Sequence, residues 1–318
     1  MTAALALLLG AFIAGRVGPG LLGRADLTRA DPSALLTAWL LSTAGVLAAA
    51  VSGIVLLLFP GHGAGTSVLS AVHGCLAAIS HGTSPRAEEL VGLAGAVLMT
   101  ALAGRFAVIG IQIARRRARR RREQLGLLRI AARCDDGAPA TWWLDYERPL
   151  AFSVAHGRGV IVATEGLRSN LPAREVAAVL AHEEAHLRGR HHLVIACVEA
   201  MSQAMPFVPL FRCAPAAVRE LVELTADAAA VRSHGTEAVR TALLAVSGHG
   251  APDGSLAMAR DAVAVRLARL DATASPSGRV RRALSCGVAA TAATSLPVLM
   301  GAALLFGVAV AACPLSGA

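Results

Sequence analysis

The sequence from residue 178 to residue 192 reads AVLAHEEAHLRGRHH and contains four histidines and two glutamates. It follows Asn170 and Pro172, residue types that are typical of the position before a helix and of its first turn. Apolar residues then recur at the three- and four-residue spacing of an amphipathic helix. We therefore predict a helix through this stretch, with His182 and His186 one turn apart on the same face.

Two imidazoles in this arrangement can bind one metal ion, and Glu183 lies directly beside them. This is the H-E-x-x-H pattern, in which the glutamate takes a proton from a zinc-bound water molecule. Because zinc lowers the pKa of that water towards neutrality, a carboxylate is a sufficient base. The alternative is an exposed charged helix surface that matches by chance, and two histidines in an otherwise apolar helix argue against it. The residues predict one zinc ion per chain and Glu183 as the general base.

A catalytic zinc site needs a third protein ligand. A second helical stretch, RELVELTADAAAVRSHG (219–235), carries Glu223 and Asp227 four residues apart on one face. Glu223 could complete the ligand set. Asp227 could accept a hydrogen bond from the far nitrogen of His182 and so fix its tautomer. Glu220 is a competing ligand on the face of Glu223, but no carboxylate lies four residues after it.

Other histidines near these helices have more than one interpretation. His191 and His192 are expected to form a polar helix end near the membrane surface rather than to be extra ligands. His234, two turns beyond Asp227, could polarise a substrate carbonyl. It could equally lie at the surface at a helix end, so it is not included in the predicted catalytic set.

The composition indicates a membrane protein. Of the 318 residues, 55% are hydrophobic and 16% are charged, and the mean hydropathy is +0.58, which is high for a soluble domain. The net charge is +9, and every basic residue is an arginine. Seven arginines lie in residues 115–122, directly after an apolar run. This placement indicates membrane topology and contact with anionic lipids rather than direct binding of nucleic acid.

A helix that crosses a bilayer needs roughly 20 apolar residues. Four stretches of the sequence are apolar and have about this length. Arginines beside these stretches, together with the positive-inside rule, place both termini outside and the first loop inside. We therefore predict a membrane domain over residues 1–114, a cytoplasmic domain over residues 115–282, and a final span with a short external tail over residues 283–318. The predicted spans are residues 2–22, 34–59, 90–114 and 284–312.

The predicted cytoplasmic segment is long enough for one compact domain. TWWLDY (141–146) and GVIVATEGL (159–167) are rich in β-branched and aromatic residues, as strands are, and LAFSVAHGRG (150–159) is typical of a strand and a turn. A substrate is expected to pair with an edge near residues 159–167. The expected fold is mainly α: a multi-span membrane protein with four transmembrane helices and a cytoplasmic, zincin-like α+β metallopeptidase domain.

The stretch LVIACVEAMSQAMPFVPLF (193–211) has the composition of a fifth span. A single crossing would put His182 and Glu223 on opposite sides of the membrane, where they could not share a metal ion. We therefore expect a buried or interfacial helical segment that holds the site close to the membrane. Arg105, inside the third predicted span, is expected to pack against a polar partner or to reach the interface.

The remaining cysteines and histidines carry weaker expectations. No cysteine spacing indicates a disulfide framework, and the predicted cytoplasmic thiols are expected to be reduced. Cys75 and Cys313 would face outward, where free thiols are favoured over a bridge. A short helix on the outer leaflet is favoured over a pH or metal sensor for the outer-loop histidines, which are His62, His73 and His81.

The pair HEEAH (182–186) and ELTAD (223–227), between predicted transmembrane helices, resembles the M56 membrane metallopeptidases, the family of β-lactam sensors. LAFSVAHGRGVIVATEGL (150–167) is similar to the strand block before H-E-x-x-H in that family and in the related M48 peptidases. The resemblance implies that Glu183 is the general base and that Asp227 supports the metal site from outside the ligand set. The zinc ligands that it implies are His182, His186 and Glu223.

The M56 resemblance also implies a signalling role. In that role the enzyme would cleave a cytoplasmic transcriptional repressor, or itself, in response to an envelope signal. The best-known sensors carry a penicillin-binding domain after the last span, whereas only CPLSGA (313–318) follows it here, so we expect any signal to enter another way. The expected partners are a protein or peptide substrate and membrane lipids.

Two alternatives to this role remain. One is an M48-like protease that degrades misfolded membrane proteins. The other is a non-catalytic membrane transducer with a structural zinc site. The intact Glu183 argues against the transducer, because a structural site does not need a base.

Overall fold

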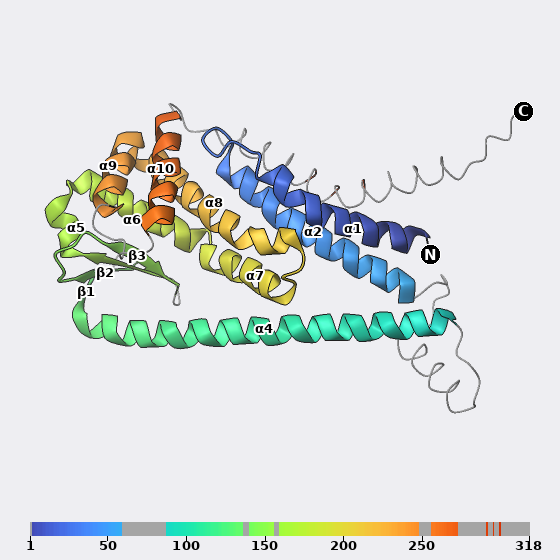
Figure 1. Cartoon of the computed structure of the whole chain (residues 1–318). Helices are drawn as coiled ribbons and strands as arrows, with labels where there is room; N and C mark the ends of the chain where they lie inside the picture. The colour runs from blue at the N-terminus through green and yellow to red at the C-terminus, as the bar shows by residue number, and fades with distance from the viewer. Residues whose placement is uncertain are drawn as a thin grey trace, which may run out of the picture.

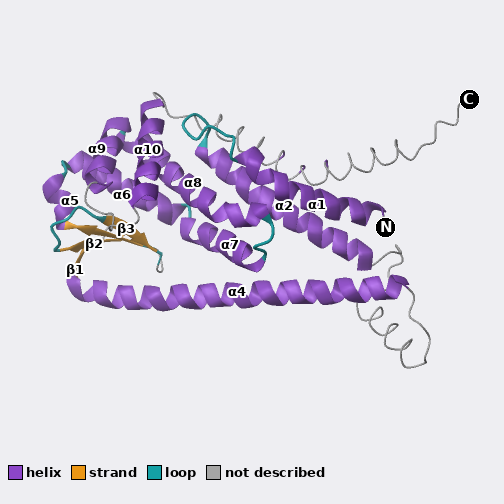
Figure 2. Cartoon of the chain, viewed as in Figure 1, coloured by secondary structure: helices purple, strands orange, loops and turns teal. Residues whose placement is uncertain are grey.

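The computed structural model describes residues 2–58, 87–135, 140–155, 159–247 and 256–272, and the single positions 291, 295 and 299. The predicted fourth span is outside these residues apart from the three single positions. The outer-loop histidines and the cysteines Cys75 and Cys313 also lie outside them. Within the described residues the chain is mainly helical, with one small sheet at the end of the molecule opposite the N-terminus (Figures 1 and 2).

The first two helices, α1 (Thr2–Leu22) and α2 (Pro32–Leu58), pack side by side along their length. They contain Ala4–Leu22 and Pro32–Leu56, the two stretches of the described chain that are long and apolar enough to cross a membrane. A Cβ on Gly53 would overlap the Leu8 side chain, so the absence of a side chain lets the helices approach closely there. Both helices are compatible with membrane insertion, and the four-span topology stays a prediction.

Helix α4 (Ala87–Ala131) is a single helix of 45 residues that runs along the other helices (Figure 1). It contains the third predicted span and the arginine cluster without a break, so the predicted domain boundary at residues 114 and 115 falls inside it. Arg105 donates from Nε to the carbonyl oxygen of Ala204 at 2.7 Å and from Nη2 to that of Gln203 at 3.0 Å. These carbonyls end helix α7 (His191–Ala204), so Arg105 has the polar partner expected of it.

The sheet has the strand order β1-β2-β4-β3. Strand β2 is parallel to β4, and the other neighbours are antiparallel. All three predicted strands are present, although the strand predicted to reach residue 167 stops at Thr164, because Glu165 begins helix α5 (Glu165–Asn170). The strands are β1 (Ala132–Asp135), β2 (Ala140–Leu144), β3 (Ala151–Val154) and β4 (Val160–Thr164).

Strand β4 is in the interior of the sheet, and all five of its residues are buried. Both of its hydrogen-bonding edges are already occupied, by β2 and by β3. The prediction that a substrate pairs near residues 159–167 is therefore wrong. The edge strand beside the helices is β3, which packs against helix α6 (Ala173–Arg188).

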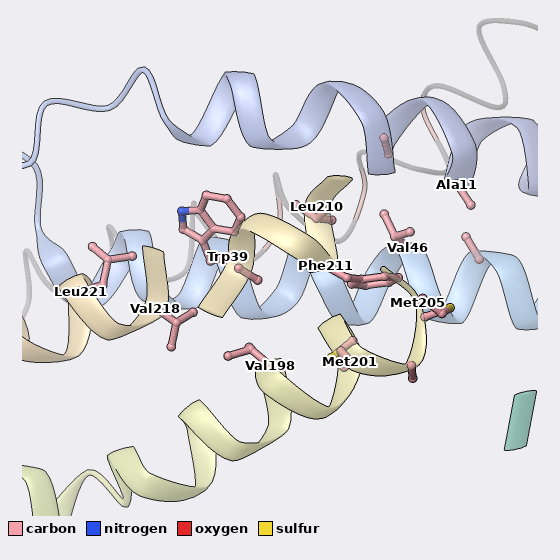
Figure 3. Packing of buried hydrophobic residues seen from close by; sticks show 14 of the residues in the cluster. Ala11, Trp39, Val46, Val198, Met201, Met205, Leu210, Phe211, Val218 and Leu221 are labelled. Carbon is pink, nitrogen blue, oxygen red and sulfur yellow. The ribbon is translucent and has the colours of Figure 1, made fainter. Parts of the chain in front are cut away.

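Helices α7 and α8 (Pro209–His234) form a hairpin that turns at residues 205–208. The apolar stretch 193–211 therefore reverses direction instead of continuing as one helix. Its side chains pack with those of α1 and α2 in the largest buried cluster (Figure 3). Prominent members are Trp39 and Val46 on α2, Val198 and Met201 on α7, and Leu210, Phe211 and Val218 on α8.

Candidate active site

Helix α6 carries the H-E-x-x-H residues. Its N-cap is Pro172, with φ −59° and ψ 156°, whereas Asn170, predicted as the cap, is the last residue of α5. The Asn170 side chain instead donates to the Gly166 carbonyl at 2.7 Å. Buried Val176 fixes α6 against the sheet and α5 through the cluster of Trp143, Ala163, Leu167 and Leu171. This packing leaves the histidine face of α6 against α8.

Three side chains from α6 and α8 converge on one point. His182 Nε2 lies 3.1 Å from His186 Nε2 and 3.4 Å from Glu223 Oε2, and His186 Nε2 lies 3.4 Å from Glu223 Oε1. Ligand atoms of a tetrahedral zinc with bonds near 2.05 Å lie about 3.3 Å apart. The two imidazole nitrogens therefore lie at about the spacing of two ligands of one ion, and each of them faces one oxygen of the Glu223 carboxylate. Among the described residues this is the one group of three His, Cys, Asp or Glu side chains close enough together to share a metal ion.

Asp227 fixes the tautomer of His182. Its Oδ1 lies 2.9 Å from His182 Nδ1, so that nitrogen donates its proton to the carboxylate, and Nε2 is the nitrogen that faces His186 and Glu223. Burial opposes charge on Asp227, but hydrogen bonds from His182 and Arg266 outweigh it and lower the pKa of Asp227 to about 2. The carboxylate is therefore an ion that can hold His182 in place at neutral pH.

The two imidazoles titrate in opposite directions. Burial disfavours a charged His182, but hydrogen bonds to Asp227 and Glu223 outweigh it and raise the pKa of His182 to about 9. Burial lowers the pKa of His186 to about 4. Without a cation, a proton on His182 Nε2 would lie between the two imidazole nitrogens and the Glu223 carboxylate. A divalent cation can bind the same nitrogens and carboxylate in place of that proton.

His191 lies behind His186. It is 5% exposed, and its Nδ1 is 2.8 Å from His186 Nδ1. The prediction that His191 forms part of a polar helix end is therefore wrong. Gly189 and Arg190 form a tight turn between α6 and α7 that brings His191 back over the last turn of α6. His192, the next residue, is only partly buried.

Glu183 projects beside the three converging side chains and is held from strand β3. Its carboxylate accepts hydrogen bonds from both the side chain and the backbone N–H of Ser153. Burial raises the pKa of Glu183 by more than these hydrogen bonds lower it. A carboxylate with a raised pKa accepts a proton more readily, as a general base must.

Arg266 on helix α10 (Leu256–Ala272) is a site residue that is not among those predicted from the sequence. Its Nε and Nη2 each lie 2.7 Å from an Asp227 carboxylate oxygen, and its Nη1 lies 3.5 Å from Glu223 Oε2. One signal was available. Arg266 and Arg269 interrupt an otherwise apolar stretch, AVAVRLARL (262–270), and arginines in such surroundings need polar partners.

Two residues considered from the sequence are not part of this cluster. Glu220 is outside the converging group, so Glu223 is the carboxylate that meets both imidazoles. The carbonyl oxygen of His234 accepts a hydrogen bond from Arg174 at 3.0 Å, and His234 does not line the cavity beside the site. The structure therefore gives no contact between His234 and the reacting region.

A cavity of about 150 Å³ opens beside the converging side chains. One part of its wall is polar and is formed by the site residues themselves. The remainder is apolar and comes mainly from α6 and from helix α9 (Thr236–Ser247). The lining residues are Ala151, Ala178, Val179, His182, Glu183, Glu223, Asp227, Val239, Ala242, Leu243, Val246 and Arg266.

Comparison with known families agrees with this chemistry. Residues 115–223 match the model of peptidase family M48. This segment is related to the M48 peptidases. The match runs from the arginine cluster of α4 to Glu223, so it includes H-E-x-x-H and the third carboxylate, and it supports a metallopeptidase. The M56 resemblance is not confirmed by it and stays a prediction. No curated protein and no solved structure matched the chain.

Proposed function

We propose that this protein is an integral membrane zinc metalloendopeptidase that hydrolyses peptide bonds at the cytoplasmic face of the membrane. The observation that carries the proposal is the convergence of His182, His186 and Glu223 beside a cavity. Glu183 lies on α6, the helix that carries the two histidines. Two imidazoles and one carboxylate, with room for a water molecule, form the ligand set of catalytic rather than structural zinc sites.

The reaction follows from these positions. A zinc ion held by the three side chains would polarise the scissile carbonyl and acidify a water molecule. Glu183 takes a proton from the water molecule as the water oxygen adds to the carbonyl carbon. When the carbon–nitrogen bond breaks, Glu183 passes this proton to the leaving amine. Asp227 holds His182 in the tautomer that ligation needs, and Arg266 holds Asp227.

The position of the substrate follows from strand β3 and the cavity. Strand β3 is an edge strand beside α6, and Ala151 on it lines the cavity. An extended peptide can pair with such an edge through its backbone. One of its side chains, next to the scissile bond, would enter the cavity against Val239, Ala242 and Leu243. We propose that this subsite takes an apolar side chain, because the wall that α9 provides is entirely apolar.

In its cellular role, the protease would cleave a cytoplasmic repressor, or itself, as part of regulatory signalling. This proposal includes four spans, external termini and a cytoplasmic domain over residues 115–282. The M48 match favours a second candidate, a quality-control protease for membrane proteins. A non-catalytic transducer with a structural zinc is a weaker alternative, because Glu183 has the surroundings of a base.

Comparison of protein N-termini in cells that express the wild type or Glu183→Gln tests the proposal. We expect a set of new N-termini that require Glu183. A repressor among their parent proteins would support signalling, and many damaged membrane proteins would support quality control. Identical N-termini in the two strains would contradict peptidase activity.

A further inference from the structure

His191 is one of the few buried polar side chains of the described chain. Its ring is nearly perpendicular to that of His186, at 88°, with 4.9 Å between the ring centroids. Its Nδ1 meets the nitrogen of His186 that faces away from Glu223. We propose that His191 is a positioning residue, which does for His186 what Asp227 does for His182. This inference rests on the proposed metal site.

The direction of the hydrogen bond follows from the ligand geometry. His186 Nε2 is the nitrogen that points at His182 and Glu223, so it must offer a lone pair to a cation. The proton of neutral His186 is then on Nδ1, which donates to Nδ1 of His191 at 2.8 Å. His191 is therefore an acceptor at this atom and carries its own proton on Nε2. It lies behind His186 and is not a further ligand.

The backbone between the two helices is shaped for this contact. On a continuous helix, residues five apart would point about 140° away from each other. The chain instead leaves α6 at Gly189 and adopts a left-handed conformation at Arg190, with φ 48° and ψ 37°. Such a conformation is uncommon for a residue other than glycine. It returns residue 191 to the ring of residue 186.

Gly189 provides the space for the ring. A Cβ at this position would overlap His191 Nε2 and Cδ2. Any side chain at residue 189 must therefore push the His191 ring away from its place. Gly189→Ala is thus a second perturbation of the same contact, and it leaves the imidazole in the protein.

The test measures zinc affinity of the purified full chain by competition with a chelator. His191→Phe keeps a ring of similar shape but removes the acceptor, and we expect roughly 10- to 100-fold weaker zinc binding. His191→Asn, whose side-chain oxygen can take the place of Nδ1, should recover most of the loss. Gly189→Ala should weaken binding, and the neighbouring variant His192→Ala should bind as the wild type does.

A spectroscopic measurement separates positioning from a general effect on folding. The visible absorption bands of bound Co²⁺ report the ligand geometry, and they should change in His191→Phe but not in His192→Ala. Wild-type affinity in His191→Phe, or no recovery in His191→Asn relative to His191→Phe, would overturn the inference. If the wild type itself binds no zinc, the proposed function fails instead, so the two failures are distinct.

Discussion

Arg266 on α10 and Asp227 on α8 form a two-point ion pair, with both nitrogen–oxygen distances at 2.7 Å. Asp227 also accepts a hydrogen bond from His182, and Arg266 lies near Glu223. Arg266→Gln should therefore lower zinc affinity and peptide cleavage by roughly 10- to 100-fold, which is the usual effect of losing a group that supports a metal ligand. Chelator competition and peptide hydrolysis measure the two losses.

Arg240→Gln provides the matched control for Arg266→Gln. Arg240 forms an ion pair with Asp271 at 3.7 Å on the surface, and such a pair contributes little. The zinc affinity of the Arg240→Gln variant should equal that of the wild type. Arg266→Gln with wild-type affinity would show that Asp227 holds His182 without help from α10.

Ser153→Ala should shift the pH dependence of peptide cleavage. The Ser153 side chain donates to Glu183 and lowers its pKa, so its loss should raise that pKa further. A general base acts only when it is deprotonated. As the solution is acidified, the variant should therefore lose activity at a higher pH than the wild type does. The measurement is the acidic limb of kcat/KM against pH. A limb that stays in place, or that moves to lower pH, contradicts the hydrogen bond as a determinant of the base.

Ala242→Phe tests the apolar subsite. The larger side chain would occupy part of a cavity of about 150 Å³ and leave the metal-binding residues unchanged. We expect cleavage to shift towards peptides with a smaller residue at one fixed position beside the scissile bond, with unchanged zinc content. A peptide library read by mass spectrometry gives this profile. The same profile in wild type and variant would place the substrate side chain elsewhere.

Labelling of Cys213 tests the predicted topology. Cys213 is a free, exposed thiol on α8, and the proposed orientation puts it in the cytoplasm. In a variant with Cys75 and Cys313 replaced by alanine, a membrane-impermeant maleimide should label the protein only after the cells are permeabilised. Labelling of Cys213 in intact cells would reverse the orientation.

The sequence predicted the elements of the site better than their assembly. The spacing of His182, Glu183 and His186 is local, so a helix places them without knowledge of the rest of the fold. Asp227 and Glu223 could be expected together because they share a helix face. Strand order depends on long-range pairing, so the local sequence does not show that β3 covers the edge of β4.

Arg266 and His191 could not be assigned from the sequence for related reasons. Arg266 reaches Asp227 only because α10 folds back on α8. Its apolar surroundings in the sequence indicate a polar partner but do not identify that partner. His191 follows Gly189 and Arg190, whose left-handed turn breaks the helical periodicity on which the prediction relied. A continuous helix would have left His191 far from His186.

The zinc content of the purified Glu223→Gln variant, compared with wild type and Glu183→Gln, tests the central claim most directly. We expect about one zinc per chain in the wild type and in Glu183→Gln, and a much smaller amount in Glu223→Gln, because the third ligand is lost. A Glu223→Gln protein that retains its full zinc content would contradict the metal centre proposed between α6 and α8.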